Sequence, residues 1–159
     1  MTATTPTSTM LDPAHFGGGT RHWHPFTPYS EDVELKIFTA DLARNETVVL
    51  LRAKAGAQLG VHDHFGRVLA YSIQGKWSYA EHDWVAAPGD FVYEVANSQH
   101  TLVADPAEDI VLFIYVEGPI HFLDGEGNVV GVETAKTFAE RYLQFCRDHG
   151  YPEPELFPF

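Results

Sequence analysis

The chain has 159 residues, which is enough for one domain with a substantial hydrophobic core. Its formal net charge of -12, from 10 Lys and Arg against 22 Asp and Glu, argues against nucleic acid and anionic membranes as partners. Hydrophobic residues make up 45% of the sequence and charged residues 20%, as in ordinary globular domains, which argues against wholesale disorder.

Residues 1–30 are rich in Thr, Pro, Gly and aromatic residues. The segment is too apolar for a free tail, so we expect an arm that is partly ordered by packing. Its aromatic residues include Phe16, Trp23, Phe26 and Tyr29. Two histidines, His22 and His24, lie one residue apart in this arm. No third ligand stands at a suitable spacing, so we interpret this pair as part of the arm.

From about residue 33 to residue 132 the sequence is a series of short β-like runs separated by turn residues. The runs are VELKIF, TVVLLRA, VLAYSI, KWSYAE, DFVYEV, HTLVA, DIVLFIYV and PIHFL. Short strands at this spacing are typical of an antiparallel sandwich or barrel. We therefore predict an all-β fold for this part of the chain.

The segment TAKTFAERYLQFCRDHG, residues 134–150, has helical periodicity. Its apolar positions include Phe138, Tyr142, Leu143 and Cys146. Thr134 is a suitable N-cap, and Gly150 followed by Pro152 provides a stop. The sequence thus predicts an amphipathic helix packed on the barrel.

The predicted elements divide a single domain into an arm (residues 1–30), a barrel (31–132), and a C-terminal helix with its tail (133–159). The tail ends in PEPELFPF, whose two phenylalanines would be exposed unless they pack on a neighbour. This favours a homodimer or a homotetramer.

Cys146 is the single cysteine, so an internal disulfide is impossible and a reducing compartment is expected. We interpret it as a buried structural thiol of the helix. The N-terminal MTATTPTSTM has neither the basic flank nor the apolar run of a secretory signal. No stretch approaches the roughly 20 apolar residues of a membrane span. These features predict a cytoplasmic protein without a membrane partner.

A second pair of histidines, His62 and His64, lies in GVHDHFGRVLAYSIQG, residues 60–75. On a strand, side chains at i and i+2 leave the same face, with Cα atoms about 6.6 Å apart. Two imidazoles so placed can lean onto one metal ion at about 2.0–2.1 Å from each nitrogen. By itself the pair is a weak signal, because two histidines in a solvated turn produce the same pattern.

The spacing around this pair matches two known motifs. The first cupin motif, G-x5-H-x-H-x3-E-x6-G, aligns with Gly56, His62, His64, Val68 and Gly75. The second, G-x5-P-x-G-x2-H, aligns with Gly89, Val95, Asn97 and His100. Over roughly residues 33–132 the chain therefore resembles the cupin superfamily.

This resemblance implies a small β-barrel of jelly-roll type, in which His62, His64 and His100 bind a divalent metal. The glutamate ligand of the first motif falls at Val68, which cannot coordinate. Asn97 stands where the second motif has glycine, and asparagine tolerates the left-handed backbone that such a position can require. A cupin that has lost its metal is the alternative interpretation.

Three neutral imidazoles leave a divalent ion with its full charge of +2, which favours anionic ligands with two oxygen atoms, such as an enolate. Among cupins, the chain is similar to the three-histidine dioxygenases that cleave carbon–carbon bonds, typified by acetylacetone dioxygenase and 2,4'-dihydroxyacetophenone dioxygenase. The similarity lies in residues 74–94, 100–103 and 118–135. It implies an enzyme that uses non-haem Fe(II) and O2 to cleave an α-hydroxyketone or a β-diketone. Zn, Ni, Mn or Cu are alternative metals.

Glu94 stands inside the apolar run FVYEV, where a buried carboxylate is costly unless it is paired. The resemblance implies a glutamate near the iron, which orients a ligand histidine or acts as a base on the substrate. The alternative is a glutamate at the rim that points to water.

Candidates for substrate binding are mostly aromatic residues of the strands, because an aromatic-walled pocket would suit an aryl ketone. They are Arg67, Tyr71, Trp77, Tyr93, Tyr115 and His82, with Tyr79 and Phe113 as further aromatics of the same strands. Ordinary core packing or surface solvation is the alternative for each.

Two other functions fit the metal motif. The first is a non-catalytic metal-binding cupin, a zinc-dependent sensor or ligand-binding protein like the cupin half of zinc-binding anti-sigma factors. The second is a cupin isomerase or hydrolase that uses Zn or Mn.

Overall fold

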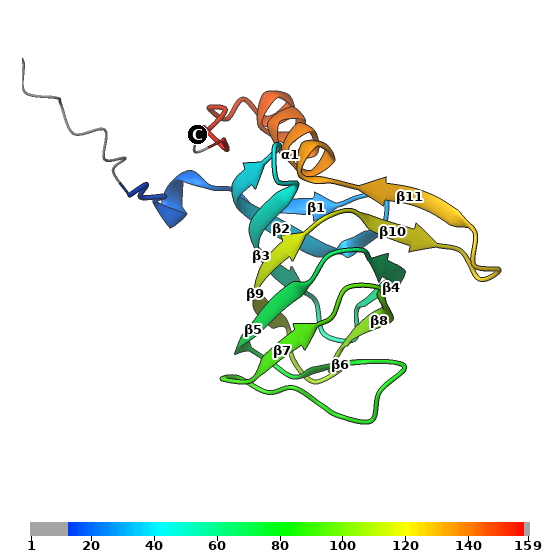
Figure 1. Cartoon of the computed structure of the whole chain (residues 1–159). Helices are drawn as coiled ribbons and strands as arrows, with labels where there is room; N and C mark the ends of the chain where they lie inside the picture. Colours follow the sequence, from blue (N-terminus) through cyan, green and yellow to red (C-terminus); the bar gives the residue numbers. More distant parts are fainter. Residues whose placement is uncertain (1–12, 158–159) are drawn as a thin grey trace, which may run out of the picture.

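The computed structural model of the chain describes residues 13–157. In this part of the chain, two antiparallel sheets face each other (Figure 1). The six-stranded sheet has the order β1 (His24–Phe26), β2 (Ser30–Asp41), β3 (Glu46–Ala53), β9 (Ile110–Glu117), β5 (Val68–Gln74), β7 (Phe91–Glu94). The five-stranded sheet has the order β11 (Val129–Glu133), β10 (Ile120–Leu123), β4 (Gln58–His64), β8 (Ser98–Ala104), β6 (Trp77–Tyr79). The all-β prediction is confirmed.

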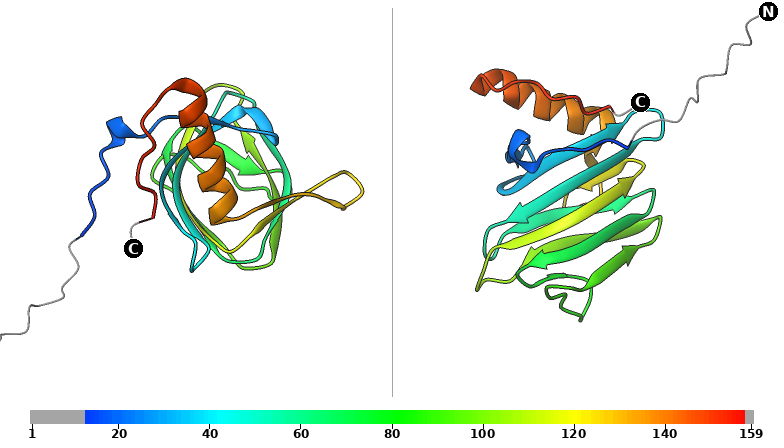
Figure 2. Two further views of the ribbon diagram at one scale, coloured as in Figure 1. Left: turned by 90° about the horizontal axis from the view of Figure 1, so that it is seen from above. Right: turned by 90° about the vertical axis from the view of Figure 1, so that its left-hand side faces the viewer.

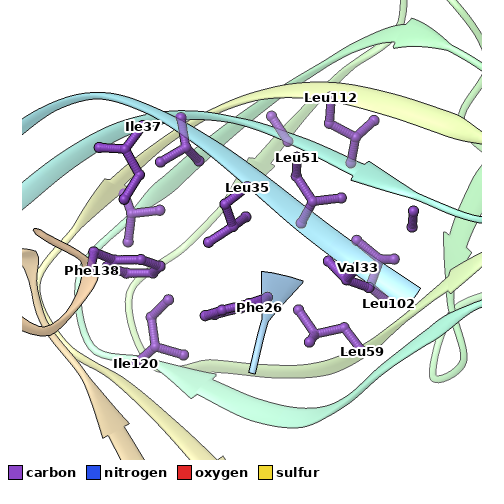
Figure 3. Close-up of a cluster of buried hydrophobic side chains, with 14 of the residues drawn as sticks. Phe26, Val33, Leu35, Ile37, Leu51, Leu59, Leu102, Leu112, Ile120 and Phe138 are labelled. Atoms are coloured by element: carbon purple, nitrogen blue, oxygen red, sulfur yellow. The ribbon is translucent and has the colours of Figure 1, made fainter. Parts of the chain in front are cut away.

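The strands curve around a common interior, and the helix lies across one end of it (Figure 2). Strand β3 buries every second residue, because successive side chains of a strand point to opposite faces. Both sheets, the arm and the helix contribute side chains to the core (Figure 3), among them Phe26, Leu35, Leu51, Leu59, Leu102 and Phe138. The helix therefore covers one end of an interior lined by apolar side chains.

Each of the eight predicted β-like runs overlaps a strand, although KWSYAE keeps only Trp77–Tyr79. Strand β4 was anticipated only through its histidine pair, and strands β1 and β11 were not predicted. Each forms by pairing with a neighbour, β1 with β2 and β11 with β10. Strand β1 has only 3 residues and β11 contains a glycine, so neither signals a strand by itself.

The C-terminal helix α1 spans Ala135–His149. The Thr134 side chain accepts a hydrogen bond from the Thr137 amide, and Gly150 ends the helix in the left-handed conformation with φ 68°. Cys146 is fully buried on the face that contacts the barrel. The predicted helix, the residues predicted to cap its two ends and the burial of Cys146 are thus confirmed. No helix in the described residues is long and apolar enough to span a membrane.

The described part of the N-terminal arm is ordered by packing, as predicted. It contains a short 3-10 helix (Gly18–Thr20) and strand β1, and its Trp23 ring lies 4.5 Å from the Arg52 guanidinium. The C-terminal tail runs beside the arm, where Arg21 donates a hydrogen bond of 2.7 Å to the Glu155 carbonyl and Leu156 is buried. Residues 1–12, which include the MTATTPTSTM segment, and Phe159 of the tail lie outside the described residues.

Candidate metal centre

Three histidines converge on the inner face of the five-stranded sheet. His62 and His64 are alternate residues at the end of β4, and both are buried. His100 on β8 lies directly opposite His62 in the antiparallel register, so its side chain leaves the same face. The potential ligand nitrogens lie within 4.8 Å of one another. Strand pairing thus brings together the three histidines that the cupin motifs singled out.

Burial makes His62 and His64 neutral ligands. Desolvation lowers the pKa of His62 to about 4 and that of His64 to about 3. Both rings are therefore uncharged at neutral pH and keep a nitrogen lone pair for a metal. The Nδ1 atom of His62 lies 2.7 Å from the Gly60 carbonyl oxygen, which leaves Nε2 free for coordination.

A buried carboxylate adjoins the histidines. The Oε2 atom of Glu94, on β7, lies 3.3 Å from Nε2 of His64 and 3.2 Å from Nε2 of His100. Its other oxygen, Oε1, accepts a hydrogen bond from the hydroxyl of Tyr79. The Tyr79 ring also stacks on His100, with 3.8 Å between ring centroids and 10° between the planes. Tyr79 therefore holds both the carboxylate and one of the imidazoles in place.

The surroundings of Glu94 and Tyr79 favour a charged carboxylate on Glu94 and a neutral phenol on Tyr79. Burial alone would raise the pKa of Glu94, but the neighbouring imidazoles of His100 and His64, together with the hydrogen bond from Tyr79, hold that pKa below its usual value. Burial, together with the charge of Glu94, raises the pKa of Tyr79 well above its usual value. Glu94 is thus ionised at neutral pH while Tyr79 remains a hydrogen-bond donor.

A divalent metal fits this donor set. Three buried atoms of the cluster have no hydrogen-bond partner in the described part of the chain: Oε2 of Glu94, Nε2 of His100 and Nδ1 of His64. An unpaired buried polar group costs about 1–3 kcal/mol, and a cation bound by Nε2 of His100 would remove that cost for the imidazole. Imidazole nitrogen suits Fe, Zn, Ni and Cu.

Two cavities reach the cluster. The larger, of about 560 Å³, touches Tyr79, Glu94 and His100, and we call it the mouth. The smaller, of about 50 Å³, lies inside the barrel against His62 and His64 and is otherwise lined mainly by apolar side chains. The volume of the mouth is in the range usual for small-molecule sites.

The mouth favours neutral organic molecules over anions. Its lining contains no Lys or Arg, whereas Asp90 and Glu94 contribute carboxylates. Most of its other lining residues are apolar or aromatic: Trp84, Val85, Ala86, Phe91, Val92, Tyr93 and Val95. An anionic ligand would meet these carboxylates and no cationic side chain of the lining, so any compensating charge would come from a metal bound by the histidines.

Two of the residues expected to bind substrate lie at the mouth. His82 belongs to the loop between β6 and β7, and its ring lies over Trp84 with 5.8 Å between centroids and 23° between planes. Tyr93 is on the edge strand β7 and forms part of the rim. Neither side chain contacts the histidine cluster as closely as Tyr79 does.

The other four candidates lie away from both cavities: Arg67, Tyr71, Trp77 and Tyr115. Tyr71 and Tyr115 point outward, because the alternate residues of β5 and β9 are the buried ones. Arg67 pairs with Glu117 at 2.8 Å instead of facing the mouth. Trp77 is buried between the sheets, where its Nε1 donates to the Ser72 hydroxyl. None of these four residues lines either of the two cavities that reach the histidine cluster.

Two residues at the site carry no distinctive sequence signal. Trp84 lies in the irregular loop of residues 80–90, where no periodicity indicates which side chains face inward. Tyr79 meets His100 only because β6 pairs with β8, and it meets Glu94 only across the gap between the two sheets. Alternation along β6 could have marked Tyr79 as inward-facing, but not as the partner of Glu94.

Comparison with known proteins relates this architecture to a sequence family. Residues 15–120 match the family described as the ChrR cupin-like domain. A search of curated proteins found no match. Among solved structures, an RmlC-like cupin protein from Ralstonia eutropha JMP134 is 42% identical, with 92% of this chain and 95% of that chain covered and a TM-score of 0.88.

Two more distant structures show the same fold. An acetylacetone dioxygenase from Acinetobacter johnsonii is 15% identical over 91% of this chain and 99% of that chain, with a TM-score of 0.74. A structure of Rhodobacter sphaeroides SigE in complex with the anti-sigma ChrR contains a chain that is 20% identical. There, 59% of this chain and 47% of that chain are covered, with a TM-score of 0.51.

Proposed function

This chain belongs to the ChrR cupin-like domain family, and we propose that its histidine cluster is the centre of a non-haem Fe(II) dioxygenase. The reaction we propose is cleavage of a carbon–carbon bond in an α-hydroxyketone or a β-diketone by O2. The observation that carries this proposal is the ionised, buried Glu94, whose Oε2 faces two of the three histidines and lines an apolar mouth.

His62, His64 and His100 would hold the metal. When bound, Fe(II) supplies electrons for O2 chemistry and a Lewis acid for the ketone oxygens. Because all three ligands are neutral, they leave the full charge of the ion to stabilise an anionic substrate oxygen.

Glu94 would act as the general base. Its Oε2 has no hydrogen-bond partner, so this oxygen is available to take a proton from the carbon next to a carbonyl group. Removal of that proton yields the enolate form of the substrate. Tyr79 donates to Oε1, so it orients the carboxylate while leaving Oε2 free.

The mouth would select the substrate. Its aromatic and apolar wall packs against an organic group, and its two carboxylates disfavour anionic substrates. A neutral ketone therefore fits better than a keto acid. An aryl group on the ketone would lie against Trp84, Phe91 and Tyr93.

The test combines metal analysis with O2 consumption. Purified protein reconstituted with Fe(II) should hold one iron per chain and consume O2 with 2-hydroxyacetophenones or β-diketones. His100→Ala should lose both iron and O2 uptake, while His22→Ala, from the histidine pair of the arm, should keep both. Iron retained in His100→Ala without activity would refute the ligand assignment.

A zinc-binding, non-catalytic role is the second candidate, favoured by the family match to the ChrR cupin-like domain. Three buried imidazoles suit Zn as well as Fe. In that case the protein purifies with one zinc per chain, and Fe(II) reconstitution produces no O2 uptake with any of these ketones.

A further inference from the structure

The smaller of the two cavities that reach the histidine cluster lies inside the barrel, and we call it the interior cavity. Its volume is about 50 Å³. Side chains from both sheets and from the helix bound it, among them Leu51 of β3, Leu102 of β8 and Phe138 of α1 (Figure 3). Well-packed protein interiors contain few voids larger than a water molecule, so a void of this size beside the candidate metal ligands calls for an explanation.

The wall of the interior cavity is apolar except at one end. The polar residues at that end are His62, His64, Tyr79 and Glu94. The two histidines are candidate metal ligands, and the Tyr79 hydroxyl donates its hydrogen bond to Glu94. An ordered water needs about two to four polar partners, and the rest of the wall, among the described residues, offers no polar side chain. The greater part of the cavity is therefore dry.

The size of the interior cavity limits what it can hold. A cavity needs about 10–15 Å³ of free space to admit one water-sized molecule. The volume of about 50 Å³ thus admits a molecule of about two or three heavy atoms and excludes an aryl ketone. Dry apolar cavities in proteins bind apolar guests such as xenon. The class of ligand that fits is therefore a small apolar gas.

The interior cavity and the mouth reach the cluster from different sides. The interior cavity touches His62 and His64, whereas the mouth touches His100. Tyr79 and Glu94 line both cavities, so this hydrogen-bonded pair stands between them. A ketone seated in the mouth would therefore leave the interior cavity free for a second molecule.

We propose that the interior cavity is a binding site for a small apolar gas, and that it holds O2 beside His62 and His64 while the ketone occupies the mouth. Transfer of an apolar molecule from water into such a cavity is favourable, and no hydrogen-bonded water has to be displaced from its apolar part. The gas site follows from the size and polarity of the cavity alone. The identity of the gas as O2 rests on the function proposed above.

Xenon tests the gas site directly. Methyl NMR spectra of the zinc-loaded protein, whose metal is diamagnetic, are recorded with and without xenon pressure. Xenon should shift the methyl resonances of Leu59, Leu102 and Val116, which line the interior cavity. It should leave the resonances of Val130 in place, because that side chain is exposed on β11 away from the cavity.

Two substitutions change the interior cavity in opposite directions. Val49 and Leu51 of β3 both line it, so Val49→Phe should fill it and abolish the xenon shifts, whereas Leu51→Ala should enlarge it and strengthen xenon binding. Val103→Phe is the matched control, because Val103 lies on the outer face of β8, and it should keep the xenon shifts. Far-UV circular dichroism and metal content should match the wild type in all three variants. Should Val49→Phe misfold, Val49→Ile, which adds a single methylene, should still weaken the shifts.

Steady-state kinetics of the Fe(II)-loaded protein test the identity of the gas. Val49→Phe should raise the KM for O2 several-fold and leave the KM for the ketone unchanged, whereas Val103→Phe should change neither. Absence of xenon shifts in the wild type would overturn the gas site. An unchanged KM for O2 in a Val49→Phe protein that no longer takes up xenon would overturn the role of the cavity in O2 binding. Xenon uptake by a protein that consumes no O2 would refute the proposed dioxygenase and still support the gas site.

Discussion

Val68 on β5 lies directly opposite Glu94 on β7, the neighbouring strand. Val68 occupies the position at which the cupin motif has a glutamate ligand, so the carboxylate missing from one strand is present on the next. Both side chains are buried, but Val68 lines only the interior cavity, whereas Glu94 also lines the mouth. The carboxylate is therefore placed where it can meet a substrate as well as the histidines.

Replacement of this carboxylate by an amide should separate catalysis from metal binding. Glu94→Gln keeps the volume and can still accept from Tyr79, but it cannot take a proton. We expect kcat to fall by about 10²–10⁴-fold, the usual contribution of a general base, with one iron per chain retained. The matched control is Glu133→Gln, another buried carboxylate, which pairs with Arg141 away from the site. The Glu133→Gln substitution should lower the stability of the protein and leave kcat within a few-fold of the wild-type value. Wild-type activity in Glu94→Gln would rule out the base.

Loss of the phenol that donates to Glu94 should shift the pH dependence. The hydrogen bond from Tyr79 lowers the pKa of Glu94, so Tyr79→Phe should raise that pKa. Since the base works only when ionised, activity disappears as pH falls through its pKa. The acid limb of the kcat/KM profile should therefore move to higher pH in Tyr79→Phe. Tyr151→Phe, which changes a phenol away from the site, should leave the limb in place. An unmoved limb in Tyr79→Phe would contradict this role.

The metal-free protein should lose stability in mild acid. Burial, with the charge of Arg141 as a second cause, lowers the pKa of His24 to about 4, and burial lowers those of His62 and His64 to about 4 and about 3. The same groups have a pKa of about 6.5 in an unfolded chain. Below about pH 6.5 the unfolded chain thus binds more protons than the folded one, and the free energy of unfolding falls as pH drops toward about 4.

Urea denaturation at a series of pH values measures this slope, to which each histidine adds at most about 1.4 kcal/mol per pH unit. The variant His24→Phe provides the check. Neither ring nitrogen of His24 has a hydrogen-bond partner in the described residues, so phenylalanine removes the titration without breaking a bond. Its slope should be about a third smaller than that of the wild type. An equal slope would show that His24 is not a source of the acid sensitivity.

The last glycine of the first cupin motif should be intolerant of a side chain. Gly75 has φ 73°, and a Cβ atom there would collide with the Asp109 carbonyl oxygen. Gly75→Ala must therefore shift the adjoining backbone, and we expect a loss of about 2–4 kcal/mol in the free energy of unfolding. Gly125→Ala is the control, because its Cβ would meet open space and its φ is not in the left-handed range. Equal thermal stability of the two variants would contradict the steric argument.

Local patterns in the sequence were sufficient for much of the fold. The β-like runs predicted their strands, and Thr134 and Gly150 predicted the ends of the helix, because capping depends on residues only a few positions apart. Asn97, at a motif position where glycine is usual, adopts φ 64° as its tolerance for the left-handed region suggested. Motif spacing also singled out the three histidines that β4 and β8 bring together.

Other features depended on which strands pair and which way they face. Strands β5 and β9 are apolar on both faces, so alternation could not tell that Tyr71 and Tyr115 point outward. Likewise, Tyr79 and Glu94 are separated by fifteen positions and lie on different sheets, and only the closing of the two sheets brings their side chains into contact. The sequence by itself determined the strands, the helix and the metal-binding motif, because these follow from short-range periodicity and spacing. The tertiary structure decided the setting of the carboxylate and the outward direction of Tyr71 and Tyr115, because non-local strand pairing alone sets register and facing.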